Sequence, residues 1–369
     1  MTSRLYFALF AILFSVAALR AQTPTPGEKD EVIKVDTQLV EVPVIITDKA
    51  GRPILNLKQT NFTLFEDGKP QEILEFSTTT APFEVALLLD TSGSTRADLQ
   101  LIQRAADSFI SSLRPGDRVA IISYNQGKQN SGVPAIVEIT TNLTDDRKEL
   151  SDALQRVATS NGTPYYDSLS AIANKVFGTA PEEKFRGRRA LVALTDGVDS
   201  TSISDFDEAR EKLEKDGVIS FFIQVNTRPF FEENLLGDCV GAIRFSQSQI
   251  RRYYKSFGTK ANVERTDDFC KLGDFERLAM SKTLYEIAND EMNRLAKTSG
   301  GKVFAVADLS EARAAFKSVA DEIGTKYSLG YYSSNEKRDG TYRKIKVDLK
   351  NVPPGTIIRA REGYTAPAN

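Results

Sequence analysis

The central part of the chain alternates between short apolar runs and longer stretches with helical spacing. The apolar runs predict strands, at residues 84–90, 117–124, 134–141, 188–195, 217–225 and 302–306. The stretches with helical spacing predict helices, at residues 96–113, 145–158, 164–177, 204–216, 275–298 and 309–325. Strands that alternate with helices are typical of an α/β fold around a largely parallel sheet. We therefore expect one α/β domain over residues 83–325.

Two β-rich segments flank the predicted α/β domain. The first segment, residues 33–80, has strand-like runs at 34–47, 62–65 and 72–76, the last two on either side of a hairpin turn at 66–69. The second segment, residues 326–365, has strand-like runs at 327–332, 342–349 and 356–361. Each segment alone would make only a marginal sheet. We expect both to pack together as one small sandwich-like β domain, with the α/β domain inserted between its halves.

The first residues of the chain have the pattern of an export signal. Arg4 supplies a short positive region, an apolar run from Leu5 to Leu19 follows, and Ala21 is a plausible residue before cleavage. Residues 1–22 therefore predict a signal peptide, with an uncleaved membrane anchor as the alternative, and residues 23–32 predict a Pro-rich linker. No other segment is apolar for long enough to predict a membrane span. We expect a periplasmic or secreted protein, or one tethered at the outer face of the membrane.

Composition narrows the classes of function. The chain has 369 residues and no histidine, which excludes Ser-His-Asp and Cys-His catalysis and zinc sites that contain histidine. Lys and Arg number 48 against 50 Asp and Glu, so no basic excess points to a nucleic-acid partner. Carboxylates, lysine, tyrosine and metal-bound water are the catalytic groups that remain.

Three oxygen-bearing side chains follow the apolar run that ends at residue 89. Asp90, Ser92 and Ser94 lie in the predicted turn after this strand, and open α/β sheets bind ligands beyond the carboxyl ends of their strands. Hard oxygen ligands suit Mg²⁺, which keeps open positions for water or substrate. The alternative is a solvated turn in which Ser92 or Ser94 caps the next helix. Two later segments favour the metal site, because Thr163 begins a helical stretch and Asp196 ends a second apolar strand.

With these segments the chain resembles the von Willebrand factor A domain family. In that family a metal-ion-dependent adhesion site (MIDAS) uses Asp-x-Ser-x-Ser, a distant Thr and a distant Asp. The resemblance implies a Rossmann-like fold with helices on both faces of the sheet. It also implies a site for Mg²⁺, or for Mn²⁺ or Ca²⁺, in which the hydroxyls contact the metal and the acids act largely through water or hydrogen-bonded ligands. The implied site residues are Asp90, Ser92, Ser94, Thr163 and Asp196.

The resemblance also implies a mode of action. A partner protein would complete the coordination of the ion with an Asp or Glu carboxylate, because only Asp90 and Asp196 offset the charge of the ion. We therefore expect a non-enzymatic, metal-dependent protein-binding or adhesion module. One alternative is an envelope scaffold or assembly factor with a structural metal. The other is a metal-dependent phosphotransferase with Asp90 as nucleophile, which is disfavoured because Ser92 stands where that chemistry needs a second acid.

The layout of the whole mature chain resembles one subgroup, the von Willebrand A-related proteins of acidobacteria. Four segments support this resemblance, at residues 40–44, 62–71, 327–332 and 361–364. The subgroup implies the same fold and metal site and adds little assigned biochemistry.

An insertion at residues 227–274 departs from the usual pattern of the family. It contains Cys239 and Cys270, and a lone cysteine pair in an exported chain predicts a disulfide, with two free thiols as the alternative. It follows the strand at 217–225, so we expect it at the rim that carries the metal. Its aromatic residues predict either a disulfide-pinned platform that selects the partner or a small satellite core, and the two are compatible. They are Phe230, Phe231, Phe245, Tyr253, Tyr254, Phe257 and Phe269.

Overall fold

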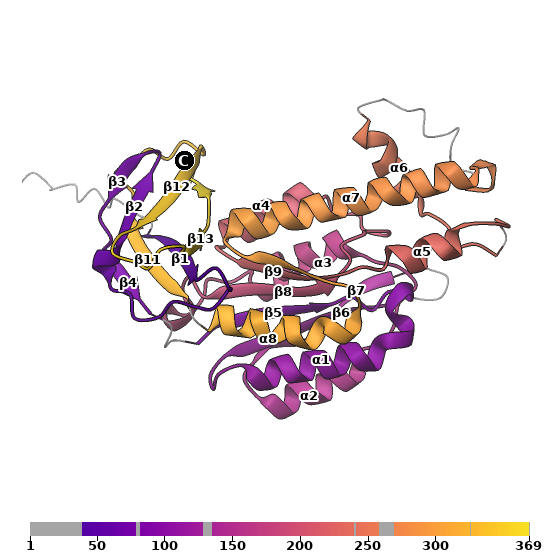
Figure 1. Cartoon of the computed structure of the whole chain (residues 1–369), viewed down its shortest axis with the longest axis horizontal. Coiled ribbons are helices and arrows are strands. Elements are labelled where there is room, and N and C mark those ends of the chain that lie inside the picture. The colour runs from indigo at the N-terminus through magenta and orange to yellow at the C-terminus, as the bar shows by residue number, and fades with distance from the viewer. Residues whose placement is uncertain are drawn as a thin grey trace, which may run out of the picture. The chain divides into compact units, whose positions relative to one another are not determined.

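A six-stranded sheet with helices on both faces forms the centre of the computed structural model (Figure 1). The structure describes residues 39–78, 82–127, 135–239, 241–257, 269–324 and 326–368, and it describes the backbone but not the side chains of residues 94, 96 and 97. The predicted signal peptide at 1–22 and linker at 23–32 lie outside the described residues. None of the helices in the described ranges combines the length and apolar character that a bilayer crossing needs.

The strands of this sheet run in the order β10-β9-β8-β5-β6-β7. Their bounds are β5 Glu84–Leu89, β6 Arg118–Gln126, β7 Ala135–Thr144, β8 Arg189–Thr195, β9 Ile219–Val225 and β10 Lys302–Val306. All neighbours pair in parallel except β6 and β7, which are antiparallel. The predicted α/β fold with a mostly parallel sheet is therefore confirmed.

Alternate residues of the central strand β5 face two separate hydrophobic cores. Val85, Leu87 and Leu89 pack on one side, against α1 (Leu99–Ser112), α2 (Arg147–Arg156) and α8 (Ala312–Ile323). Ala86 and Leu88 pack on the other side, against α3 (Tyr165–Ala171), α4 (Phe206–Lys215) and α7 (Asp274–Ser299). Because every residue of β5 is buried, the strand reads as a continuous apolar run rather than an alternating one.

Three predicted helices contain turns of a different type. The predicted helix 96–113 is a 3-10 turn at Gly93–Asp98 followed by α1, and 309–325 is a 3-10 turn at Leu309–Glu311 followed by α8. The predicted helix 164–177 is α3 followed by a π turn at Ile172–Val176. Further 3-10 turns lie at Gln59–Asn61 and Glu183–Phe185. Such changes depend on local packing, which helical spacing alone does not encode.

The two flanking segments together build two antiparallel four-stranded sheets, as expected. One has the order β13-β1-β11-β4 and the other β14-β12-β2-β3, so each sheet contains strands from both segments. The strands of the first segment are β1 Leu39–Thr47, β2 Phe62–Glu66, β3 Lys69–Gln71 and β4 Glu75–Ser77. Those of the second are β11 Tyr327–Tyr332, β12 Tyr342–Leu349, β13 Ile357–Ala360 and β14 Gly363–Thr365. Val42, Leu64 and Leu329 belong to the core that the two sheets share.

The predicted hairpin with strands at 62–65 and 72–76 is wrong in its second strand. Asp67 and Gly68 both have positive φ, of 47° and 79°, which is typical of a tight type I′ turn. The tight turn pairs β2 directly with the short strand β3, and after β3 the chain leaves this sheet. β4 pairs with β11 in the other sheet. The hydrophobic pattern predicted a strand here but could not predict which sheet it joins.

Candidate metal site

Asp90 lies immediately after β5, where its side chain is buried and held by hydrogen bonds. The Ser92 N–H donates to Oδ1 of Asp90 at 3.0 Å, and the Thr195 hydroxyl donates to Oδ2 at 2.8 Å. The Gly197 N–H in turn donates to the Thr195 hydroxyl at 2.9 Å. Both carboxylate oxygens of Asp90 therefore have a partner that restricts rotation of the side chain.

Asp196 follows β8 and is held in the same manner. The Val198 N–H donates to Oδ1 of Asp196 at 2.9 Å, and the Thr227 hydroxyl donates to Oδ2. The Thr227 hydroxyl also hydrogen bonds to the Tyr285 hydroxyl at 2.8 Å. Each of the two acids thus accepts one N–H from two residues later in the chain and one threonine hydroxyl.

Hydrogen bonds join the three loops that carry the predicted site residues. The Thr163 N–H donates to the Ser200 hydroxyl at 2.8 Å, and the Ser200 N–H donates to the Thr163 carbonyl at 2.9 Å. The Ser160 N–H donates to the Thr91 carbonyl at 2.8 Å. The loop before α3 therefore contacts both the loop after β5 and the loop after β8. Since β5 and β8 are adjacent and parallel, Asp90 and Asp196 emerge at the same edge of the sheet.

Burial raises the pKa of both acids. Burial is the main cause for Asp90, and the hydrogen bonds from Ser92 and Thr195 oppose it. For Asp196 burial and then repulsion by Asp90 raise the pKa to about 7, against the hydrogen bonds from Thr227 and Val198. Among the described residues, no Lys or Arg forms an ion pair with either acid. Two adjacent buried carboxylates without a cationic partner are costly, and a bound cation would relieve that cost.

The donor set at this edge fits a hard divalent cation. Asp90, Ser92, Thr163 and Asp196 are 2, 5, 8 and 8% exposed, and all carry oxygen donors. The backbone of Ser94 lies in the 3-10 turn after β5, and its side chain lies outside the described part of the structure. The described residues hold no group of three or more His, Cys, Asp or Glu side chains that could bind a metal. An ion here would therefore depend on hydroxyl and water oxygens in addition to the two acids.

Three residues that support the acids were not predicted from the sequence. Thr195 precedes Asp196 directly, and a hydroxyl at the end of a buried strand was a usable signal. Thr227 is the first residue of the insertion, and Tyr285 lies on α7, 58 residues further along the chain. Nothing in the local pattern connects Tyr285 with Asp196.

The insertion at 227–274 contains two helices and forms a small core together with α7. The helices are α5 (Arg228–Leu235) and α6 (Gln247–Ser256), with a 3-10 turn at Phe269–Lys271. Cys239 and Cys270 form a disulfide, with Cα atoms 5.2 Å apart. The satellite core that the aromatic pattern predicted is present. Its buried members are Leu235, Phe245, Ile250, Phe269, Leu272, Met280 and Leu284, with Phe231, Tyr253 and Tyr254 packed against them.

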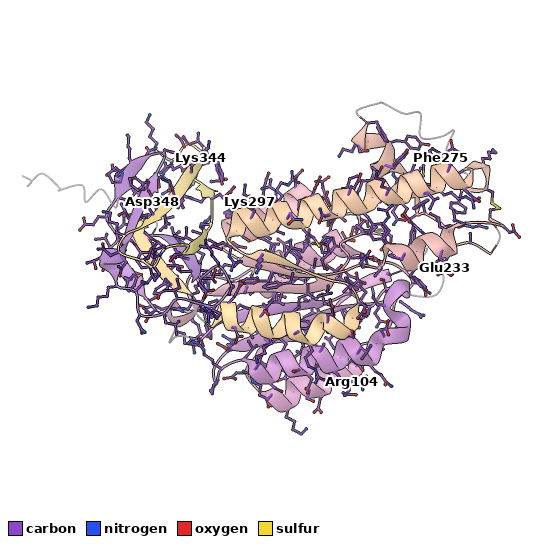
Figure 2. The ribbon with its side chains drawn as sticks, viewed as in Figure 1. Arg104, Glu233, Phe275, Lys297, Lys344 and Asp348 are labelled. Carbon is purple, nitrogen blue, oxygen red and sulfur yellow. A yellow bond between two sulfur atoms is a disulfide. The ribbon has the colours of Figure 1, made fainter. Side chains whose placement is uncertain are left out.

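Other apolar side chains of this region face solvent. Phe230 and Phe257 are 47 and 58% exposed. Phe275, at the start of α7, is 85% exposed and projects outward at the end of the helix (Figure 2). The aromatic residues therefore divide between the satellite core and an exposed surface.

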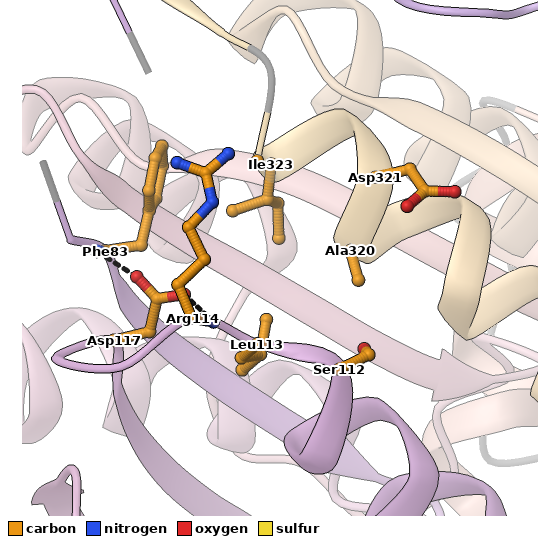
Figure 3. Close-up of a pocket in the computed structure, with 9 residues that line it drawn as sticks. Phe83, Ser112, Leu113, Arg114, Asp117, Ala320, Asp321 and Ile323 are labelled. Carbon is orange, nitrogen blue, oxygen red and sulfur yellow. Dashed lines mark hydrogen bonds between the residues drawn. The ribbon is translucent and has the colours of Figure 1, made fainter. Parts of the chain in front are cut away.

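A pocket of about 140 Å³ lies at the opposite edge of the sheet, near the amino ends of β5 and β6 (Figure 3). Asp117 accepts the Phe83 N–H at 2.8 Å and the Arg114 N–H at 2.7 Å beside this pocket. These hydrogen bonds hold the segments that lead into β5 and β6, at the end of the sheet opposite to Asp90 and Asp196. We therefore assign this pocket no part in the candidate site.

Comparison with solved structures returns several proteins at low sequence identity. Proximal thread matrix protein 1 from the mussel byssus is 14% identical, with a TM-score of 0.42 over 70% of this chain and 51% of that chain. The chain thus spans about half the length of the mussel protein. The von Willebrand factor type A protein from Catenulispora acidiphila is 12% identical, with a TM-score of 0.42 over 90% of this chain and 75% of that chain. BatB from Bacteroides thetaiotaomicron is 16% identical, with a TM-score of 0.38 over 65% of this chain and 98% of that chain.

Comparison of the sequence with protein families identifies the α/β domain. No curated protein matches the chain. Residues 84–253 match the family model of the von Willebrand factor type A domain. This range begins at β5 and includes all the predicted metal ligands, from Asp90 to Asp196. The family match and the mostly parallel six-stranded sheet together show that the chain is a protein with a von Willebrand factor type A domain.

Proposed function

We propose that this chain is an exported, metal-dependent protein-binding module. Asp90, Ser92, Ser94, Thr163 and Asp196 would hold a divalent cation, Mg²⁺ in the first instance, and the bound ion would accept a carboxylate from a partner protein. The observation that carries this proposal is the pair Asp90 and Asp196, two buried acids at one edge of the sheet with no ion pair among the described residues. Domains of this family bind proteins, which favours a binding role over a catalytic one.

The chain's own hydrogen bonds support a preorganised site. Both acids are already oriented by a backbone N–H and a threonine hydroxyl, so little freedom remains to be lost on binding. The remaining proposed ligands, Ser92, Ser94 and Thr163, carry neutral hydroxyls. The two acids together match the formal charge of one divalent ion, but with only neutral hydroxyls beside them the ion would keep open coordination positions that a partner carboxylate can fill.

A location outside the cytoplasm is part of the proposal. The Cys239–Cys270 disulfide is compatible with an oxidising compartment such as the periplasm or the exterior. We also keep the resemblance to the acidobacterial subgroup as part of the proposal. That resemblance rests on the four sequence segments at residues 40–44, 62–71, 327–332 and 361–364.

Capture of the partner from the native envelope tests the proposed function. We expect the full chain to retain a protein partner with Mg²⁺ and to lose it with a chelator. The variant Asp90→Asn keeps the size of the side chain and removes its charge, so it should lose the partner while its circular dichroism spectrum stays unchanged. Asp152→Asn makes the same change at an exposed acid of α2 and should behave as wild type. A partner retained equally with Mg²⁺, with chelator and by Asp90→Asn would contradict a metal-bridged contact.

The same variants discriminate the alternatives. An assembly factor with a structural metal would keep its partner in Asp90→Asn as long as the chain folds. A metal-dependent phosphotransferase would release phosphate from a phosphomonoester probe, and that turnover would disappear in Asp90→Asn.

A further inference from the structure

The insertion reaches the proposed metal site through a chain of two hydroxyl groups. Tyr285 of α7 lies 2.8 Å from the Thr227 hydroxyl, and Thr227 donates to Oδ2 of Asp196. When Asp196 is ionised, as a metal ligand would be, its carboxylate only accepts, and because the Thr227 hydroxyl has a single proton, Tyr285 is then the donor to Thr227. The order of donation is therefore Tyr285 to Thr227 to Asp196. Hydrogen bonds in such a chain polarise and strengthen each other in a buried environment.

A second contact holds the loop that follows Asp196, at Asp199, three residues further along the chain. Nη2 of Arg252, on α6, lies 3.2 Å from Oδ2 of Asp199, and Nη1 donates to the Asp199 carbonyl at 3.2 Å. The Asp199 side chain is fully buried, and the guanidinium of Arg252 lies 4.4 Å from the centre of the Tyr166 ring. The Tyr166 hydroxyl donates at 2.6 Å to Glu291 of α7. These contacts fix the orientation of Arg252.

The loop at 196–199 is therefore hydrogen bonded to the insertion at both of its ends, by Thr227 at Asp196 and by Arg252 at Asp199, and α7 supports these contacts through Tyr285 and Glu291. Its next residue, Ser200, exchanges two hydrogen bonds with Thr163, another proposed ligand. A displacement of this loop would thus move Asp196 and Thr163 together. The satellite core and the Cys239–Cys270 disulfide give the insertion a stable base from which to hold it.

We propose that the insertion and α7 form a positioning clamp on the metal site. Tyr285 and Thr227 orient the Asp196 carboxylate, Arg252 anchors the loop at Asp199, and together they set the affinity of the site for a divalent cation. The clamp rests on the proposed function, because it presumes that Asp196 contributes to a metal site. Outer partners that orient metal ligands typically account for about 10–100-fold in metal affinity.

Titration of the full chain with Mn²⁺, followed by calorimetry and electron paramagnetic resonance, tests the clamp. Thr227→Val removes the hydroxyl and keeps the branched shape, and we expect about 10–100-fold weaker Mn²⁺ binding. Thr227→Ser restores a hydroxyl and should recover most of the affinity. Tyr285→Phe removes only the first donor of the chain, so its loss should be smaller than that of Thr227→Val. The matched control is Tyr253→Phe in α6, whose ring packs on the satellite core and contacts Tyr254 and Phe257.

The outcomes separate the clamp from the proposed function and from a merely structural role. Weaker Mn²⁺ binding by Thr227→Val, with recovery in Thr227→Ser and no change in Tyr253→Phe, supports the clamp. Equal Mn²⁺ affinity of wild type, Thr227→Val and Tyr285→Phe overturns the clamp and leaves the proposed function standing. A wild-type chain that binds neither Mn²⁺ nor Mg²⁺ overturns both. If Thr227→Val does not fold, Tyr285→Phe decides, since its ring can still pack against Phe231.

Discussion

Replacement of Gly197 by alanine tests whether α7 supports the loop that carries Asp196. Gly197 has a φ of +74°, in the left-handed region that L side chains rarely adopt. A Cβ atom at this position would lie 2.8 Å from Cε and 2.9 Å from Sδ of Met292, on α7. Met292 is fully buried, so it can yield only by displacing its own neighbours.

Two terms determine the expected loss of stability. The left-handed backbone costs an alanine about 1–2 kcal/mol relative to glycine. Overpacking against Met292 adds about 1–3 kcal/mol. Gly217 provides the matched control, because its φ is +66° and its added Cβ would meet only Nη1 of Arg361, at 3.8 Å. We expect Gly217→Ala to show the backbone cost alone and Gly197→Ala to cost about 2–5 kcal/mol in total.

Equilibrium unfolding in urea measures both variants in the absence of added metal. A double-mutant cycle with Met292→Ala isolates the contact, since that change alone should cost about 2–5 kcal/mol by leaving a cavity. In the Gly197→Ala background the same change should cost less, because the cavity accommodates the added methyl group. Equal losses for Gly197→Ala and Gly217→Ala, together with additive costs in the cycle, would refute close packing of α7 on the loop at 196–199.

Three further predictions concern the insertion, α7 and the β domain. Replacing Cys239 and Cys270 together by serine should cost about 3–4 kcal/mol in urea unfolding, because their separation of 31 residues closes a long loop; a loss under 1 kcal/mol would contradict this. Burial raises the pKa of Glu291 to about 7, so its contribution to stability is complete below its unfolded pKa near 4.5 and is lost as the pH rises through 7. Glu291→Gln should therefore match wild type in free energy of unfolding at pH 4 and exceed wild type by about 3 kcal/mol at pH 8. A difference between variant and wild type that stays constant across this pH range would exclude this role of Glu291. Arg343→Met should lower the free energy of unfolding by about 3–5 kcal/mol, because it leaves the buried Glu66 carboxylate, 3.5 Å away, without its cation. A free energy of unfolding within about 0.5 kcal/mol of wild type, which is less than the ~1 kcal/mol of an ordinary substitution, would rule this out in thermal and urea unfolding.

The position of the candidate site followed from local sequence features. Asp90 and Asp196 each end an apolar strand, and the strands were predicted to be parallel, so their carboxyl ends had to meet at one edge. That the acids lack an ion pair among the described residues could not be predicted. The chain has many lysines and arginines, and only the fold decides which of them approach a given carboxylate.

The sequence by itself determined the alternation of strands and helices, the contribution of both flanking segments to a β domain, and the edge of the sheet at which Asp90 and Asp196 lie. These features depend on periodicity and on the direction of strands, which short stretches of residues encode. Only the tertiary structure decided that β4 leaves its hairpin for the other sheet, and that the aromatic residues of the insertion divide between a core and an exposed surface. It alone also brought Tyr285 to Thr227 and Arg252 to Asp199, because contacts between side chains more than 50 residues apart leave no periodic trace in the sequence.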